Sequence, residues 1–150
     1  MVGSIREILK IVTPEQLQAA FSQFEGELAE RVKPLDAVLE KNIMSPDVPS
    51  TFQHMAFVEA WRNRVARYLY LVDGFVSYSK SSQFSLPVEK GTTEAVRDAW
   101  KKTLCGPFEA VQRRLENLIE SIDSRVNMCK KKVGMEEVVG GPASRSRFAA

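Results

Sequence analysis

The feature that most constrains this chain is a run of apolar residues between Leu104 and Val133, spaced three or four positions apart. This spacing places them on one face of an α-helix of about thirty residues. A face this long cannot be buried in a small compact core, so it must lie along a second long helix. The later run is Leu104, Phe108, Val111, Leu115, Leu118, Ile122, Val126, Cys129 and Val133. A matching earlier run is Val58, Trp61, Val65, Tyr68, Val72 and Phe75. The sequence therefore predicts an all-α fold, an elongated bundle or hairpin of about four to five helices with two long antiparallel amphipathic helices.

Start signals divide the first half of the chain into helices. A hydroxyl residue followed three positions later by Glu or Gln is typical of a capping box, and it occurs at Ser4, Thr13 and Ser50. Pro34 lies inside the second predicted helix, where it removes a hydrogen bond and clashes with the preceding turn, so we expect a kink or a split there. The predicted helices span about 5–12, 14–43 and 51–79.

The second half contains a loop and a long helical region. Residues 80–92 show no sustained period and are expected to form a connecting loop. The last helical region begins near Thr92 or Thr93. Gly106-Pro107 is expected to break it into a piece ending near Leu104 and a long helix from Pro107.

The C-terminal end of that helix carries a stop signal. Basic side chains complement the dipole at a helix C-terminus, and Lys130, Lys131 and Lys132 are followed by Gly134. We therefore expect one helical domain over 1–134 and an extended arm over 135–150. The arm has paired glycines, a proline and no period, which indicates that it is ordered only when bound to a neighbouring molecule. Its candidate contact residues are Arg145, Arg147 and Phe148.

The formal net charge of +2 conceals an asymmetry. Residues 1–50 hold 5 basic and 8 acidic side chains, and residues 51–150 hold 16 basic and 11 acidic ones. The second half could meet an anionic partner, or oppositely charged surfaces could meet between subunits. No apolar run reaches the roughly 20 residues of a membrane helix, and the N-terminus lacks signal-peptide and transit-peptide patterns. An intracellular, soluble protein without a membrane partner is expected, either cytoplasmic or incorporated into a virus particle.

No residue pattern indicates catalysis or a metal site. The one histidine, His54, lies near a helix start, where a surface or capping role is common. Cys105 and Cys129 are 24 positions apart, which along a helix is about 36 Å, so reduced thiols are expected rather than a disulfide or a zinc site. Glycine-rich phosphate-binding motifs are absent from the sequence. We expect a non-enzymatic protein without a cofactor.

The third predicted helix carries a candidate surface for nucleic acid or another anionic partner. Arg62, Arg64 and Arg67 interleave with aromatic residues, and such a pattern can neutralise phosphates and stack on unpaired bases. However, Trp61 and Tyr68 belong to the apolar face, which favours a core role for them and a solvated or subunit-facing surface for the arginines. The second candidate set is Lys130, Lys131 and Lys132.

Arg125 interrupts a seven-residue repeat. Leu104, Val111 and Leu118 are spaced by seven positions, and Arg125 comes next. A charge at such a seam lowers stability but can set the register when an acidic residue of the first half pairs with it. The alternative, which we favour, is that Val126 continues the apolar face and Arg125 points outward.

The third and last helices, with the ending Ile122-Asp-Ser-Arg-Val-Asn-Met-Cys-Lys-Lys-Lys132, resemble the small helical recombination-mediator proteins of tailed bacteriophages. The resemblance covers about half of the chain and consists of helix pattern and basic residues. It implies assembly into rings and binding to single-stranded DNA. Helical virion proteins of phages share the same pattern.

Three functional hypotheses follow. The favoured one is a non-enzymatic structural protein that assembles with itself or with other subunits of a large particle, such as a phage virion. The second is a single-stranded-nucleic-acid-binding accessory protein of recombination or replication. The third is a helical adaptor that receives a protein partner in an apolar groove.

Overall fold

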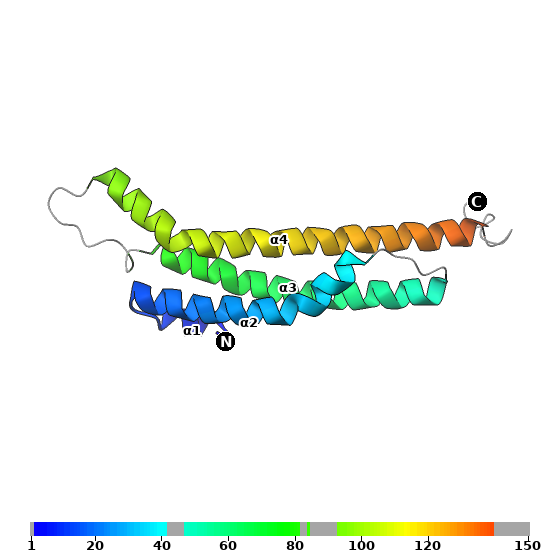
Figure 1. Ribbon diagram of the computed structural model, residues 1–150, viewed down its shortest axis with the longest axis horizontal. Coiled ribbons are helices and arrows are strands. Elements are labelled where there is room, and N and C mark those ends of the chain that lie inside the picture. Colours follow the sequence, from blue (N-terminus) through cyan, green and yellow to red (C-terminus); the bar gives the residue numbers. More distant parts are fainter. Residues whose placement is uncertain (1, 42–46, 82–83, 85–92, 140–150) are drawn as a thin grey trace.

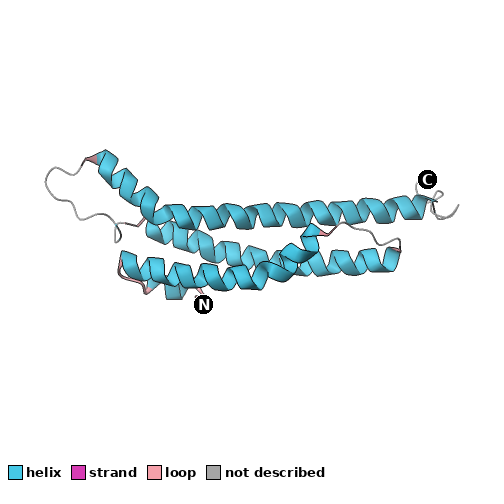
Figure 2. Cartoon of the chain, viewed as in Figure 1, coloured by secondary structure: helices cyan, strands magenta, loops and turns pink. Residues whose placement is uncertain are grey.

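The computed structural model describes residues 2–41, 47–81, 84 and 93–139. Four helices make up this part of the chain, and none of its residues forms a strand (Figure 2). The helices are α1 (Ile5–Leu9), α2 (Pro14–Glu40), α3 (Val48–Ser79) and α4 (Glu94–Val139). The molecule is elongated: α3 and α4 run antiparallel as a long hairpin, and α2 lies along part of it (Figure 1). The predicted all-α fold with two long paired helices is confirmed.

Polar contacts mark the register between α3 and α4. Lys80 pairs with Glu109 at 3.4 Å, the Gln112 amide donates to Asp73 at 2.6 Å, and Arg62 pairs with Asp123 at 2.8 Å. The residue number falls along α3 as it rises along α4, as an antiparallel pair requires. Between these contacts the two predicted apolar faces meet. Their members are buried, except that Tyr68 and Leu118 are half-buried.

Four phenylalanines join α2 to the hairpin. Phe21 of α2 packs against Phe75 of α3 and Phe108 of α4, with ring centroids 5.2 and 4.3 Å apart. Phe24 of α2 packs against Phe75 at 5.6 Å, and Phe75 and Phe108 lie 5.8 Å apart. All four rings are buried. Tilted and edge-to-face packing of this kind adds about 0.5–1.5 kcal/mol per pair beyond the area that is buried. This cluster forms the part of the core where α2, α3 and α4 meet near the C-terminal end of α3.

Both internal prolines bend their helices without ending them. Helix α2 continues through Pro34 to Glu40 and changes direction toward its C-terminal end, so the predicted kink is present and the split is not (Figure 1). Helix α4 is continuous through Pro107, and its first residues tilt away from the long remainder. The predicted break at Gly106-Pro107 is therefore wrong. Leu104 and Phe108, both 1% exposed, hold the helix in the core on either side of the bend.

The predicted end of α4 is also wrong. The helix continues through Gly134 to Val139, so residues 135–139 are helical and the three lysines do not lie in its last turn. A Cβ at Gly134 would meet no atom within 4 Å, and Gly134 can remain inside the helix at a cost of about 1 kcal/mol. The expected arm contacts Arg145, Arg147 and Phe148 lie outside the described residues.

The remaining helix ends agree only in part with the predicted start signals and ends. Thr13 and Gln16 form the predicted capping box, with the Gln16 N–H donating to Thr13 Oγ1 at 3.2 Å. Ser4 is at the N-cap of α1 but makes no side-chain capping hydrogen bond. At α3, Asp47 is the cap and accepts from the Ser50 N–H at 2.8 Å, so the predicted cap at Ser50 is wrong. The first two helices end at Leu9 and Glu40, earlier than predicted.

In the ranges that the structure describes, no helix combines the length and the hydropathy needed to cross a bilayer.

Removing the Phe75 ring, which contacts the other three rings, should destabilise the folded protein. Phe75→Ala is expected to lower the free energy of unfolding by about 3–5 kcal/mol, because it leaves a cavity among three other rings. Urea denaturation followed by circular dichroism measures this. Tyr70→Ala, at a side chain 64% exposed on the same helix, is the matched control and should change stability by less than about 0.5 kcal/mol. Equal effects of the two substitutions would contradict the assignment of the core.

Candidate functional site

Arg62, a predicted anionic-partner contact, is already paired with an acidic residue of the same chain. Its guanidinium donates to both carboxylate oxygens of Asp123, at 2.8 and 3.3 Å. The hydrogen bond to Arg62 lowers the pKa of the Asp123 carboxyl, and the same bond raises the pKa of Arg62. Both side chains are about half exposed, so the pair adds little stability. Its role is to link α3 to α4.

The aromatic residues near the arginines belong to the core rather than to a stacking surface. Trp61 is 7% exposed and Tyr68 is half-buried. The Arg64 guanidinium carbon lies 5.0 Å from the centroid of the Trp61 ring, which holds Arg64 against the helix surface. Near these arginines, Tyr70 is an aromatic side chain that is open to solvent, at 64% exposure. The predicted core role of Trp61 is confirmed.

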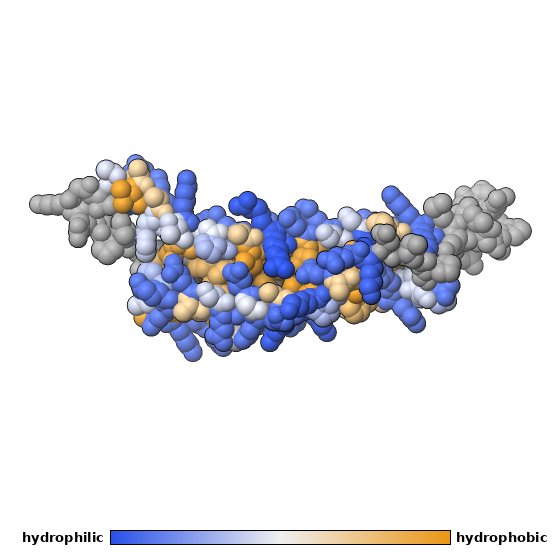
Figure 3. Space-filling view, in the orientation of Figure 1, coloured by the Kyte–Doolittle hydropathy of each residue, from blue (hydrophilic) through white to orange (hydrophobic). Residues whose placement is uncertain are grey.

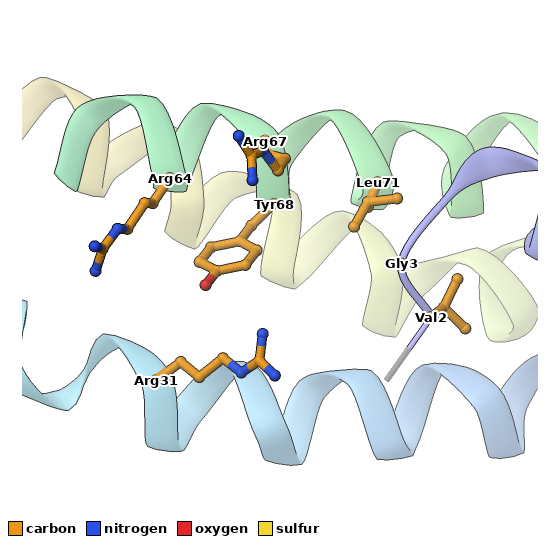
Figure 4. A pocket seen from close by; sticks show the side chains of 7 residues that line it. All are labelled: Val2, Gly3, Arg31, Arg64, Arg67, Tyr68 and Leu71. Carbon is orange, nitrogen blue, oxygen red and sulfur yellow. The ribbon is translucent and has the colours of Figure 1, made fainter. Parts of the chain in front are cut away.

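Arg64 and Arg67 line a cleft between α2 and α3 of about 340 Å³. The wall from α2 is Arg31, whose side chain extends toward Tyr68 across the space between the two helices (Figure 4). None of the three arginines forms an ion pair with a carboxylate of the described residues. We call this the arginine cleft. Its lining residues are Val2, Gly3, Arg31, Arg64, Arg67, Tyr68 and Leu71.

No sequence pattern pointed to Arg31 as a site residue. It stands on α2 next to the buried Val32 and has no aromatic neighbour in the chain. Only the packing of α2 against α3 brings it to Arg64 and Arg67.

The lysine set lies elsewhere on the molecule. Lys130 is seven residues beyond Asp123 on α4, which is about 10 Å along the helix. Because α3 runs the opposite way, Arg64 and Arg67 lie on the other side of the Arg62–Asp123 pair. Lys130 and Lys131 are exposed and Lys132 is half-buried. The structure therefore separates the two predicted contact sets.

Arg125 binds the C-terminal end of α2. Its two terminal nitrogens donate to the backbone carbonyls of Leu39 and Lys41, each at 2.6 Å. A cation at the last carbonyls of a helix satisfies acceptors that have no partner within the helix. Val126 continues the buried face as predicted, but Arg125 neither points freely outward nor pairs with an acidic side chain. The backbone contact therefore replaces both expectations for this side chain, pairing with an acidic residue and pointing outward.

The hairpin continues beyond the contact of Arg125 with α2. Residues 126–139 of α4 extend about 20 Å past that point, opposite the first turns of α3. We call Val48–Val58 together with residues 126–139 the distal hairpin. Its surface carries Phe52, Phe57 and Met128 at 46%, 42% and 54% exposure. By the register of the Arg62–Asp123 pair, Phe57 and Met128 lie at the same level.

Apolar surface is also visible along the body of the molecule. Figure 3 shows apolar side chains gathered in the strip between α4 and the helices below it on the face in view. The distal hairpin is therefore one of several places where apolar groups reach solvent.

The two cysteines are buried and free, as predicted. Burial raises the pKa of the Cys129 thiol, which keeps it protonated at neutral pH. Cys105 Sγ lies 2.8 Å from Ser79 Oγ. Among the residues placed by the structure, no group of three or more His, Cys, Asp or Glu side chains could hold a metal ion.

No protein-family model, curated protein or solved structure matches this chain. The function is therefore inferred from the geometry of the chain itself.

His54 makes the stability of the junction between α3 and α4 depend on pH. Within the described part of the chain its Nε2 atom is buried without a hydrogen-bond partner. Burial, and next the charge of Arg125, lower the pKa of His54 below its ordinary value. The unfolded chain thus binds the proton more readily, so stability is lost as pH falls below about 6.5 toward the lowered folded pKa.

Urea midpoints at about pH 7.5, 6.5 and 5.5 test this effect. The midpoint of the wild-type protein should fall over this window, and His54→Gln should remove the fall, because this is the one histidine of the chain. An identical slope in His54→Gln would assign the pH dependence to other groups.

Proposed function

We propose that this chain is a non-enzymatic helical assembly protein, which uses the distal hairpin to join copies of itself or other subunits of a larger particle, such as a phage virion. The observation that carries the proposal is that α2 ends at Glu40 while the hairpin continues for about 20 Å. Large apolar side chains remain exposed on that extension.

The exposure of these side chains supports a protein partner. Exposed apolar surface can mark an interface, and three large apolar side chains are exposed at one end of the hairpin. Phe52 and Phe57 come from α3 and Met128 from α4, and all three belong to the part of the hairpin beyond α2. A helix of another chain would extend there the packing that α2 provides elsewhere.

The polar surface fits assembly as well. Acidic residues exceed basic ones in the first 50 positions, and basic residues exceed acidic ones afterwards. Oppositely charged surfaces orient subunits and speed their association, so contact between the acidic first part of one copy and the basic later part of another would be favoured.

The mass of the protein in solution tests this proposal. At concentrations of about 10–100 μM, a range in which transient assemblies commonly form, light scattering after gel filtration should give a mass above one chain. Phe52→Ser combined with Phe57→Ser should return it to one chain, since the interface loses its apolar anchors. Tyr70→Ser, which removes a more exposed aromatic outside the distal hairpin, is the matched control and should leave the mass unchanged.

If the wild-type protein has the mass of a single chain, the proposal of self-assembly is wrong. In that case the same apolar surface would favour the adaptor function, with a helix of a different protein as its partner.

A second candidate function is binding to single-stranded nucleic acid. The observation in its favour is that Arg64 and Arg67 make no ion pair with the described carboxylates, and that Lys130 and Lys131 are exposed. The buried Trp61 and the separation of the two basic sets count against it, because strand binding favours a continuous basic groove with open aromatic rings.

Fluorescence anisotropy with labelled single-stranded DNA tests the second candidate. Binding at about 50 mM salt should weaken by orders of magnitude at about 200 mM. Lys130→Gln combined with Lys131→Gln should reduce the salt dependence. Arg62→Gln is the matched control, because Asp123 already occupies this arginine. Absent binding at both salt concentrations would eliminate the second candidate.

A further inference from the structure

We propose that the arginine cleft binds a compact phosphate chain, of the pyrophosphate or triphosphate class, through Arg31, Arg64 and Arg67. This site goes beyond the assembly function and does not depend on it.

The charge of the cleft points to an anion. Guanidinium groups stay protonated at any physiological pH, so the cleft holds three positive charges. None is neutralised by a carboxylate of the residues that the structure places. Elsewhere the molecule does pair its arginines: Arg62 with Asp123 and Arg114 with Asp36. Three like charges around one cleft repel each other, and a bound anion would relieve that repulsion.

The geometry of the cleft suits oxyanions. Each guanidinium presents a planar fork of N–H donors that matches two phosphate oxygens at once. Arg31 comes from α2 and Arg64 from α3, and both side chains reach into the space between the helices, so donors approach from both sides (Figure 4). Arg67 lines the cleft from α3. The contact of Arg64 with the Trp61 ring limits the freedom of that side chain, which reduces the entropy lost on binding.

The walls and the size of the cleft favour a small ligand. Val2 and the buried Leu71 form apolar walls, and the three arginines are exposed and accessible to a ligand from solvent. The volume of about 340 Å³ is at the lower end of the range for small-molecule sites. One phosphate group carries at most about two negative charges, so two linked groups match three guanidiniums better than one does.

Isothermal titration of inorganic pyrophosphate into the full chain tests the site. Binding is expected at about 50 mM salt and should weaken as salt screens the charges. Arg31→Gln and Arg67→Gln should each weaken the affinity at least about tenfold, the loss expected for a charged hydrogen-bonding group. Arg113→Gln, at an exposed arginine of α4, is the matched control and should bind like the wild type. Circular dichroism confirms that each variant is folded.

Two further titrations, with inorganic triphosphate and with a nucleoside triphosphate, distinguish the possible sources of the phosphate chain. Inorganic triphosphate and a nucleoside triphosphate of equal affinity would assign recognition to the phosphate chain alone. Tighter binding of the nucleotide would add a contact to its base, and either result supports the site.

Three results would overturn the proposal: no binding of pyrophosphate, an equal loss in Arg113→Gln, or an oligonucleotide without terminal phosphate that binds through Arg31 and Arg67 and is not displaced by pyrophosphate. The mass of Arg31→Gln in solution should equal that of the wild type. Failure of this site is therefore distinguishable from failure of the assembly proposal.

Discussion

The structure depends on the contact between the apolar faces of α3 and α4. Each face is too long to be covered by a short element, and each covers the other over most of its length. Burial of apolar area in such a seam is the main favourable term in the stability of a small helical protein. Helix α2 adds a third side to only part of this seam, through the Phe21 and Phe24 rings.

The length of α2 determines which part of the α3–α4 hairpin is not covered by a third helix. Arg125 binds the carbonyls at the end of α2, and beyond that point the two long helices have no third helix among the described residues. Burial, and next the charge of Arg125, lower the pKa of His54 and so disfavour its protonation. One arginine thus marks the boundary of the three-helix section and influences the charge state of its neighbour.

The arginines of α3 show how tertiary contacts separate residues that look alike in sequence. Arg62, Arg64 and Arg67 follow one another within six positions. Arg62 reaches Asp123 on α4, and Arg64 packs on Trp61. Arg64 and Arg67 line a cleft together with Arg31 of α2. Successive helical positions point about 100° apart, so neighbours in sequence meet different partners.

The sequence by itself determined the helical class, the two long faces and the start of α2, because periodicity and capping act within a few residues of the chain. It did not determine where α4 bends or ends, since packing on both sides of Pro107 and the tolerance of Gly134 within a helix outweighed the local break signals. The partner of Arg125 and the meeting of Arg31 with Arg64 and Arg67 were decided only by the tertiary structure. These contacts join residues that are more than thirty positions apart, and no local pattern encodes such distances.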